Sequence, residues 1–142
     1  MHVYVHVPFC ARRCSYCDFA IAVRKASPDA DFLEALRAEW RLRRSVAAWD
    51  VWPSISTLYF GGGTPSRLEG DTIGRLIQMI TADRPLASDA EVTLEANPDD
   101  VTPDRAIAWR EAGVNRISLG VQSHEPAVLE WMHRTHTAQQ VP

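Results

Sequence analysis

Cysteine is confined to one short stretch of this sequence. All three cysteines of the chain, Cys10, Cys14 and Cys17, follow the spacing C-x3-C-x2-C. Thiolates this close together can converge on one metal centre, and soft thiolate ligands select Zn, Cu(I) or iron–sulfur clusters. A structural zinc site and a typical [4Fe–4S] cluster both take four protein ligands. With three cysteines one coordination position stays open, which is the arrangement of a metal site that does chemistry.

A glycine-rich stretch is the second candidate site. Gly61, Gly62 and Gly63 are followed by Thr64 and Pro65. Glycine lets the backbone approach a ligand closely and adopt positive φ, so free N–H and C=O groups can grip a polar ligand. The stretch is not a Walker loop, because no Gly-Lys-Ser/Thr follows it. Taken alone, a flexible strand-to-helix turn is an equally good interpretation.

Three polar residues complete the candidate set. Glu95 ends an apolar run, where an acid is costly to bury unless it is paired, so it could contact cofactor hydroxyls or an amine, or form a structural salt bridge or cap. Gln122 offers two donors and an acceptor. Arg134 could pair bidentately with a carboxylate, although most such arginines are solvated surface residues.

Alternating strands and helices must position these residues. Hydrophobic periodicity predicts strands over 1–8, 55–60, 91–96 and 116–121. Apolar stripes and capping residues predict helices over 28–48, 71–82, 103–112 and 126–133. For the first helix we expect Ser27 as N-cap and Pro28 as the first helical residue. For the third we expect Thr102 as N-cap and Gly113 as the terminating glycine.

This order predicts an α/β fold, a partial (β/α) barrel of about four β-α units. Consecutive β-α units form parallel sheets with right-handed crossovers. Each candidate residue or stretch, Arg134 excepted, ends a strand or follows one, and ligands bind at the carboxyl ends of parallel strands. An intact flavodoxin-like domain is the alternative fold. A half barrel would leave a sheet edge unpaired, through which the chain could form oligomers.

Composition narrows the class of protein. The 142 residues fit one domain, and the net charge of −3 gives no reason to expect nucleic acid as a partner. No stretch is long and apolar enough to span a bilayer, and the start lacks a signal-peptide pattern. Three clustered cysteines argue against a disulfide framework and for a reducing, cytoplasmic location.

The cysteine spacing just after a strand, followed by the glycine stretch, resembles the radical S-adenosylmethionine (radical SAM) superfamily. The resemblance implies that Cys10, Cys14 and Cys17 bind three irons of a [4Fe–4S] cluster, whose fourth iron is chelated by S-adenosylmethionine. Radical SAM cores usually have about six β-α units in a three-quarter barrel. We therefore expect residues 1–142 to be the N-terminal part of such a core, truncated at the C-terminus.

Further runs tighten the resemblance to one subgroup. Tyr4 to Cys10, Cys17-Asp18-Phe19, the GGGTPS loop, Leu94 to Pro98 and Gly120 to Ser123 resemble the oxygen-independent coproporphyrinogen oxidase-like group, and within it the HemW-type haem chaperones. The match runs from Val3 to about His136. Residue by residue, it implies contacts to S-adenosylmethionine from Tyr4, Tyr16, Gly62, Gly63, Thr64, Glu95, Gln122 and Arg134.

Phe19 separates the two kinds of protein in that subgroup. The coproporphyrinogen III dehydrogenases carry a further cysteine where this chain has Phe19. The resemblance therefore favours a chaperone that binds haem and delivers it to haem-accepting proteins. It has no transmembrane segment, and a partner could associate it with a membrane. The alternatives are the dehydrogenase and an inactive or zinc-binding fragment, so enzymatic activity stays open. Haem is the possible cargo, and we expect His124, His133 and His136 to be exposed histidines rather than its ligands.

Overall fold

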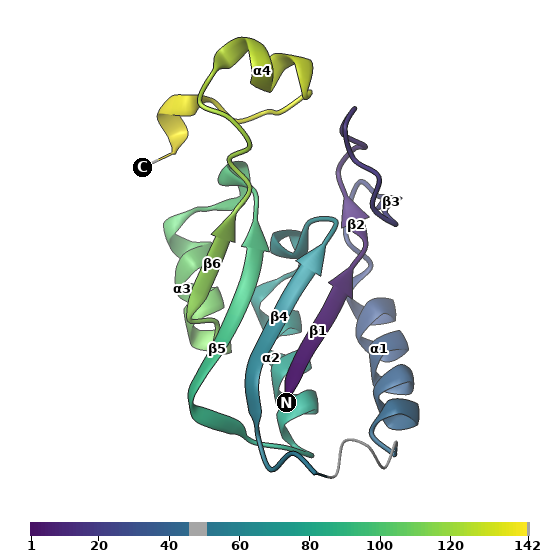
Figure 1. Cartoon of the computed structure of the whole chain (residues 1–142). Helices are drawn as coiled ribbons and strands as arrows, with labels where there is room; N and C mark the ends of the chain where they lie inside the picture. The colour runs from purple at the N-terminus through teal and green to yellow at the C-terminus, as the bar shows by residue number, and fades with distance from the viewer. Residues whose placement is uncertain (46–50, 142) are drawn as a thin grey trace.

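Four parallel strands form the centre of the molecule. The structure is a computed structural model and describes residues 1–45 and 51–141. The strands are β1 (His2–Val7), β4 (Ile55–Gly62), β5 (Leu86–Ala96) and β6 (Arg116–Leu119), which lie side by side in the order β1-β4-β5-β6 (Figure 1). The sheet order equals the chain order, as expected when each strand is followed by a helix that returns the chain to the next parallel position.

Helices cover one face of this sheet and leave the other open. They are α1 (Asp29–Arg43), α2 (Gly70–Thr81) and α3 (Pro103–Ala112), with α2 packed between the other two (Figure 1). The short helix α4 (Pro126–Trp131) lies beyond the carboxyl ends of the strands. Helices on the outside and an open inner face are the arrangement of a partial barrel, so the predicted fold class is confirmed.

Strand alternation places the core under the helices. Val5, Phe60 and Leu94 are neighbours in register, and their side chains are buried on the helix-covered face. Leu76 and Ile80 of α2 are buried in the same apolar cluster. Burying a side chain of this size contributes roughly 1.5–3 kcal/mol, so this layer fixes the register of the sheet.

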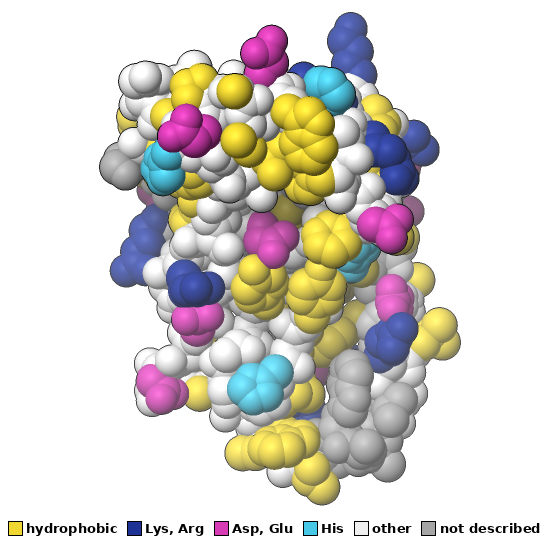
Figure 2. All heavy atoms as spheres, turned by 45° about the horizontal axis from the view of Figure 1, so that its top comes forward, with side chains coloured by type: hydrophobic (Ala, Val, Ile, Leu, Met, Phe, Trp, Pro, Cys, Tyr) yellow, Lys and Arg dark blue, Asp and Glu magenta, His cyan; other side chains and the backbone are white. Residues whose placement is uncertain are grey.

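The opposite face of the sheet carries aromatic and polar side chains. Tyr4 pairs in register with Tyr59, and Tyr59 with Thr93, so their side chains share the open face. Figure 2 shows hydrophobic side chains on this side of the molecule interspersed with acidic, basic and histidine side chains. The open face therefore differs in character from the apolar face under the helices.

Helix α1 begins differently from the prediction. Ser27 does not cap it: Pro28 is the N-cap residue, and the Ser27 hydroxyl donates instead to the carbonyl oxygen of Arg67. The predicted end near Ala48 lies outside the described residues, and the helix ends at Arg43. By contrast, Thr102 and Gly113 bound α3 as predicted: the Thr102 hydroxyl accepts from the Arg105 N–H, and Gly113 has φ +106°.

Other element boundaries differ where tertiary pairing overrides local pattern. Strand β5 begins at Leu86, earlier than predicted, because Leu86 pairs with Ile55. The register then shifts before the next pair, Thr57 with Glu91, and the residues between them show no apolar alternation. Strand β6 ends at Leu119 and α4 at Trp131, both earlier than predicted.

The cysteine stretch holds two short parallel strands, β2 (Phe9–Cys10) and β3 (Ala22–Val23), which the sequence did not indicate. The 3₁₀ turns η2 (Pro65–Arg67), η3 (Pro98–Asp100) and η4 (Ala138–Gln140) were also not predicted.

Within the described residues, no helix combines the length and apolar character that crossing a bilayer would require.

Candidate cofactor site

A pocket of about 820 Å³ lies at the carboxyl ends of the strands. Its walls come from the cysteine stretch, the glycine stretch, the ends of β5 and β6, and the segment that follows α4. The sequence predicted that residues following different strands would meet at this rim. Ten of the eleven predicted site residues do line the pocket: Cys10, Cys14, Cys17, Tyr16, Gly62, Gly63, Thr64, Glu95, Gln122 and Arg134.

The three thiols are free and partly exposed in this pocket. Cys10 ends β2, and Cys14 and Cys17 are joined by a backbone hydrogen bond of 3.2 Å from the Cys17 N–H to the Cys14 carbonyl. Within the described part of the chain, no three His, Cys, Asp or Glu side chains are gathered into a ready-made metal site. The donor chemistry nevertheless fits an iron–sulfur cluster: three soft sulfur ligands share one pocket.

Cys10 is the most constrained of the three. Its Sγ lies 3.5 Å from the Thr64 hydroxyl, which donates to it. Burial raises the pKa of the Cys10 thiol, while the hydrogen bond from Thr64 lowers it. A bound metal would shift the balance towards the thiolate, because a coordinating thiol is deprotonated outright.

Gly62 and Gly63 are required by the protein itself, whether or not a ligand is present. Gly62 has φ +117°, and a Cβ there would lie 2.6 Å from the His6 ring. A Cβ on Gly63 would lie 2.9 Å from the Cys10 Sγ and 2.8 Å from the Pro8 carbonyl carbon. The glycine stretch therefore packs directly against the cysteine stretch and determines where Cys10 can lie.

Glu95 is held by two donors from the neighbouring strand. Its Oε1 accepts from the Tyr59 hydroxyl at 2.8 Å, and its Oε2 accepts from the Gly62 N–H at 3.0 Å. These two hydrogen bonds offset the free-energy cost of half-burying the Glu95 carboxylate. Both the structural and the ligand-binding roles considered for Glu95 are compatible with this arrangement, because a carboxylate can accept about four hydrogen bonds.

Arg134 is oriented by two acceptors at the pocket wall. One guanidinium nitrogen, Nη2, donates to Asn97 Oδ1 at 2.7 Å and to the Gly120 carbonyl at 2.8 Å. Arg134 also lies close enough to the Tyr16 phenol to lower its pKa, although burial outweighs this effect and raises the Tyr16 pKa overall. A guanidinium held in this way leaves further donors for an anionic group in the pocket.

Tyr4 is the one predicted residue that the structure does not bring to this pocket. Its ring stacks on Tyr59 with centroids 5.9 Å apart, on the open face of the sheet. Burial raises the pKa of Tyr4, with Glu95 adding to the shift. Tyr4 therefore neighbours Glu95 through Tyr59, and its predicted contact with S-adenosylmethionine stays a prediction.

Sequence reasoning missed two residues that shape the site. Asn97 orients Arg134, and it lies inside the run 94–98, which is part of the family resemblance. His136 was expected to be exposed, but its side chain is 3% exposed and its Nε2 lies 3.0 Å from the Val121 carbonyl oxygen. No local pattern distinguishes a buried histidine at the end of a chain from an exposed one.

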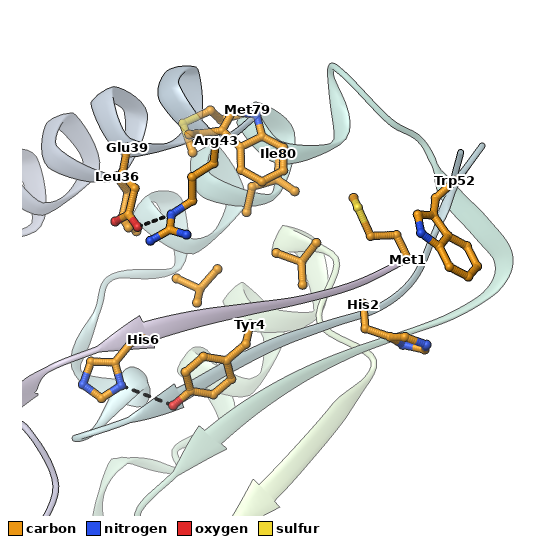
Figure 3. Close-up of a pocket in the computed structure, with 13 residues that line it drawn as sticks. Met1, His2, Tyr4, His6, Leu36, Glu39, Arg43, Trp52, Met79 and Ile80 are labelled. Carbon is orange, nitrogen blue, oxygen red and sulfur yellow. Dashed lines mark hydrogen bonds and ion pairs between the residues drawn. The ribbon is translucent and has the colours of Figure 1, made fainter. Parts of the chain in front are cut away.

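A second pocket, of about 600 Å³, lies between β1 and the helices α1 and α2 (Figure 3). Its lining is largely apolar, from Leu36, Met79 and Ile80, with the Glu39–Arg43 ion pair at 2.5 Å on its wall. It contains neither a thiol nor any predicted site residue except Tyr4. The pocket with the thiols is therefore the candidate cofactor site.

Comparison with known families agrees with this geometry. The profile of the radical SAM superfamily matches residues 4–141. The chain belongs to the radical SAM superfamily.

Radical SAM relatives of known function resemble this chain closely over part of their length. It is 45% identical to "Heme chaperone HemW" of Mycobacterium tuberculosis, with 95% of this chain and 35% of the relative covered. It is 40% identical to "Heme chaperone HemW" of Escherichia coli, with 99% and 36% covered. The predicted resemblance to HemW-type proteins is thereby confirmed. The chain spans about a third of the length of these relatives.

Two solved structures bear on the fold. Coproporphyrinogen III oxidase (HemN) of Escherichia coli superimposes with a TM-score of 0.83 at 29% identity, covering 99% of this chain and 32% of that one. The Elp3 protein of Methanocaldococcus infernus superimposes with a TM-score of 0.60 at 19% identity, which supports the fold alone.

Proposed function

We propose that this chain is the cofactor-binding part of a haem chaperone. In the proposal Cys10, Cys14 and Cys17 hold a [4Fe–4S] cluster, S-adenosylmethionine binds beside it, and haem is the cargo passed to haem-requiring proteins. The observation that carries the proposal is the shared pocket: residues from four strand ends, including all three thiols, line one cavity. The relatives named as haem chaperones supply the identity of the cargo.

The polar residues of the pocket differ in charge and in hydrogen-bonding groups, so each suits a different part of S-adenosylmethionine. S-adenosylmethionine carries an amino group, a carboxylate and ribose hydroxyls. Arg134 suits the carboxylate, since its orientation is already fixed by Asn97 and Gly120. Glu95 suits hydroxyls or an amine. Gln122 offers both donors and an acceptor. When bound, the cluster and S-adenosylmethionine supply electron transfer and radical chemistry that protein side chains cannot.

Residues of the pocket wall would surround part of the cluster. Thr64 is buried behind Cys10, and Ser15 of the cysteine stretch donates at 3.1 Å to the Trp131 carbonyl at the end of α4. This bond joins the cysteine stretch to the segment that carries Arg134. Burial of the sulfur ligands and hydrogen bonds to them are two features by which a protein tunes a cluster.

Coproporphyrinogen III dehydrogenase is the second candidate function. The superposition on HemN favours it, because 99% of this chain follows that fold. Against it stands Phe19, which occupies the position of the dehydrogenases' additional cysteine and lines the pocket with 63% of its surface exposed. Phe19 cannot supply a thiolate, so we favour the chaperone. A cytoplasmic location is part of the same proposal.

The proposal is tested by haem binding and transfer. The protein, with its cluster reconstituted anaerobically, is titrated with haem and followed by the Soret absorbance, then mixed with a haem-free acceptor enzyme whose activity reports transfer. The chaperone proposal expects saturable binding, acceptor activation and no decarboxylation of coproporphyrinogen III. Decarboxylation of coproporphyrinogen III would favour the dehydrogenase instead. A protein that shows no haem binding and no decarboxylation would overturn both candidate functions.

A further inference from the structure

The backbone around Gln122 is bent into a strained turn. The Ser123 N–H donates to the Val121 carbonyl at 2.8 Å, which closes a three-residue turn centred on Gln122. Gln122 has φ +68°, and among the described residues His133 is the only other non-glycine residue with positive φ. Three-residue turns with positive φ are rare and strained, and such strain persists only where surrounding contacts hold it.

His136 supplies a contact that holds this turn. Its Nε2 lies 3.0 Å from the same Val121 carbonyl. Because a carbonyl oxygen only accepts, the Nε2 must carry the proton and donate. The Val121 oxygen therefore accepts two hydrogen bonds, one from Ser123 and one from His136, which uses both of its lone pairs.

The other ring nitrogen of His136, Nδ1, does not explain why a histidine stands at this position. The Nδ1 atom is buried and has no hydrogen-bond partner among the described residues, although the side chain is only 3% exposed. Leaving a buried acceptor unpaired is unfavourable, and an apolar side chain of similar size would avoid it. The donor at Nε2 is thus the feature of histidine that this position uses.

A second side chain ties the same turn from the same segment. Arg134, two residues before His136, donates to the Gly120 carbonyl, next to Val121. A Cβ on Gly120 would lie 3.2 Å from the Gln122 Nε2, so the Gln122 side chain lies against the Gly120 backbone. Arg134 and His136 therefore hold the two residues that directly precede Gln122, Gly120 and Val121.

We propose that His136 is a positioning residue: its Nε2–H fixes the strained turn that presents Gln122 to S-adenosylmethionine. This inference rests on the proposed function, since it assigns S-adenosylmethionine to the pocket. His136 does not line the pocket, so in this proposal it acts on the cofactor through Gln122 and not by direct contact.

Two substitutions separate the donor from the bulk of the side chain. In His136→Gln the amide nitrogen can replace Nε2 as donor to Val121, whereas His136→Leu fills the space without a donor. We expect His136→Leu to weaken S-adenosylmethionine binding to the reconstituted protein by roughly fivefold to tenfold, the effect of one hydrogen bond, and His136→Gln to restore most of it. His124→Leu, the same change at an exposed histidine, should leave the affinity unchanged.

A double-mutant cycle tests whether His136 acts through Gln122. On a Gln122→Ala background, His136→Leu should cost little further affinity, because the side chain it positions is gone. Iron content and thermal unfolding are measured for each variant, so that loss of the cluster or of the fold is recognised. Full additivity of the two losses, or a His136→Leu variant that binds as tightly as the wild type, would overturn the inference.

NMR of the cofactor-free protein separates this inference from the proposed function. We expect ¹³Cα and ¹³Cβ shifts of Gln122 that report positive φ, retained in His136→Gln and lost in His136→Leu. If the wild type fails to bind S-adenosylmethionine but shows this pattern, the proposed function fails while the positioning of Gln122 stands. Unchanged Gln122 shifts in His136→Leu would overturn the positioning itself.

Discussion

At the scale of single residues, the glycine next to Cys10 couples the two strongest sequence motifs. Gly63 was predicted to let the backbone approach a ligand, yet its nearest neighbours are the Cys10 Sγ and the Pro8 backbone. The absence of a side chain at Gly63 therefore also leaves room for the Sγ of Cys10, a proposed cluster ligand. This role could not be deduced from the sequence, because 52 residues lie between Cys10 and Gly63.

Gly63→Ala is expected to lower the cluster content of the protein. The added Cβ would lie 2.9 Å from the Cys10 Sγ, so the thiol must move. We expect loss of most of the bound iron after reconstitution, measured by iron and sulfide analysis. Gly74→Ala in α2 is the matched control, since its Cβ would meet only ordinary contacts at 3.6 Å. That control should retain iron and gain roughly 0.5–1 kcal/mol in unfolding free energy. Full iron content in Gly63→Ala would contradict this account.

Tyr59 gives a prediction about pH. Burial raises its pKa above the ordinary value of about 10, and the hydrogen bond to Glu95 raises it further. The folded state therefore binds the phenolic proton more tightly than the unfolded state, so this contribution to stability is complete below the unfolded pKa. It is lost as the pH rises through the folded pKa. Tyr59→Phe should weaken the alkaline fall in unfolding free energy, measured by denaturant titrations at several pH values. An identical fall in the variant would contradict the assignment.

At the scale of elements, helix capping shows where local sequence decides structure and where it does not. Thr102 and Ser27 carry the same signature, a hydroxyl residue followed by proline. Thr102 caps α3, but Ser27 bonds to Arg67 while Asp29 accepts from the Glu69 N–H. The long-range contacts with residues 67–69 decide the entry to α1, and a local pattern cannot contain them.

Thr102 and Ser27 are a matched pair of positions for mutation. Thr102→Ala should cost about 1 kcal/mol in unfolding free energy, the usual cost of losing an N-cap. Ser27→Ala should cost clearly less, because it removes only a 3.4 Å bond to a backbone carbonyl. Urea denaturation of both variants measures the difference. Equal losses would contradict the assignment of the caps.

The order of the elements was predictable, whereas several of their ends were not. Apolar periodicity located the four main strands and the helices that follow them. The parallel pair β2 and β3 was missed because two-residue strands have no periodicity to detect. Leu119 ends β6 early because the chain then turns twice: the Val121 N–H donates to the Leu119 carbonyl, and the Ser123 N–H donates to the Val121 carbonyl. The candidate pocket followed from placing motifs at strand ends, but the contacts of Tyr4 and His136 depended on packing.

At the scale of the whole molecule, the sheet has two outer strands. Strands β1 and β6 each pair with one neighbour among the described elements. Such edges present unpaired N–H and C=O groups that can recruit another strand. The 142-residue chain is therefore expected to associate as its concentration rises, which sedimentation velocity would detect. A single monomeric species across a hundredfold range of concentration would contradict this expectation.

The most direct test of the central claim is the electron paramagnetic resonance of the reduced protein after anaerobic iron–sulfur reconstitution, recorded with and without S-adenosylmethionine. Three cysteine ligands at one pocket predict a [4Fe–4S]⁺ signal, and an open iron beside Arg134 and Glu95 predicts that S-adenosylmethionine changes it. Replacing Cys14 with serine should abolish the signal, because two thiolates remain. A wild-type protein without a cluster signal, or with one indifferent to S-adenosylmethionine, would contradict the account.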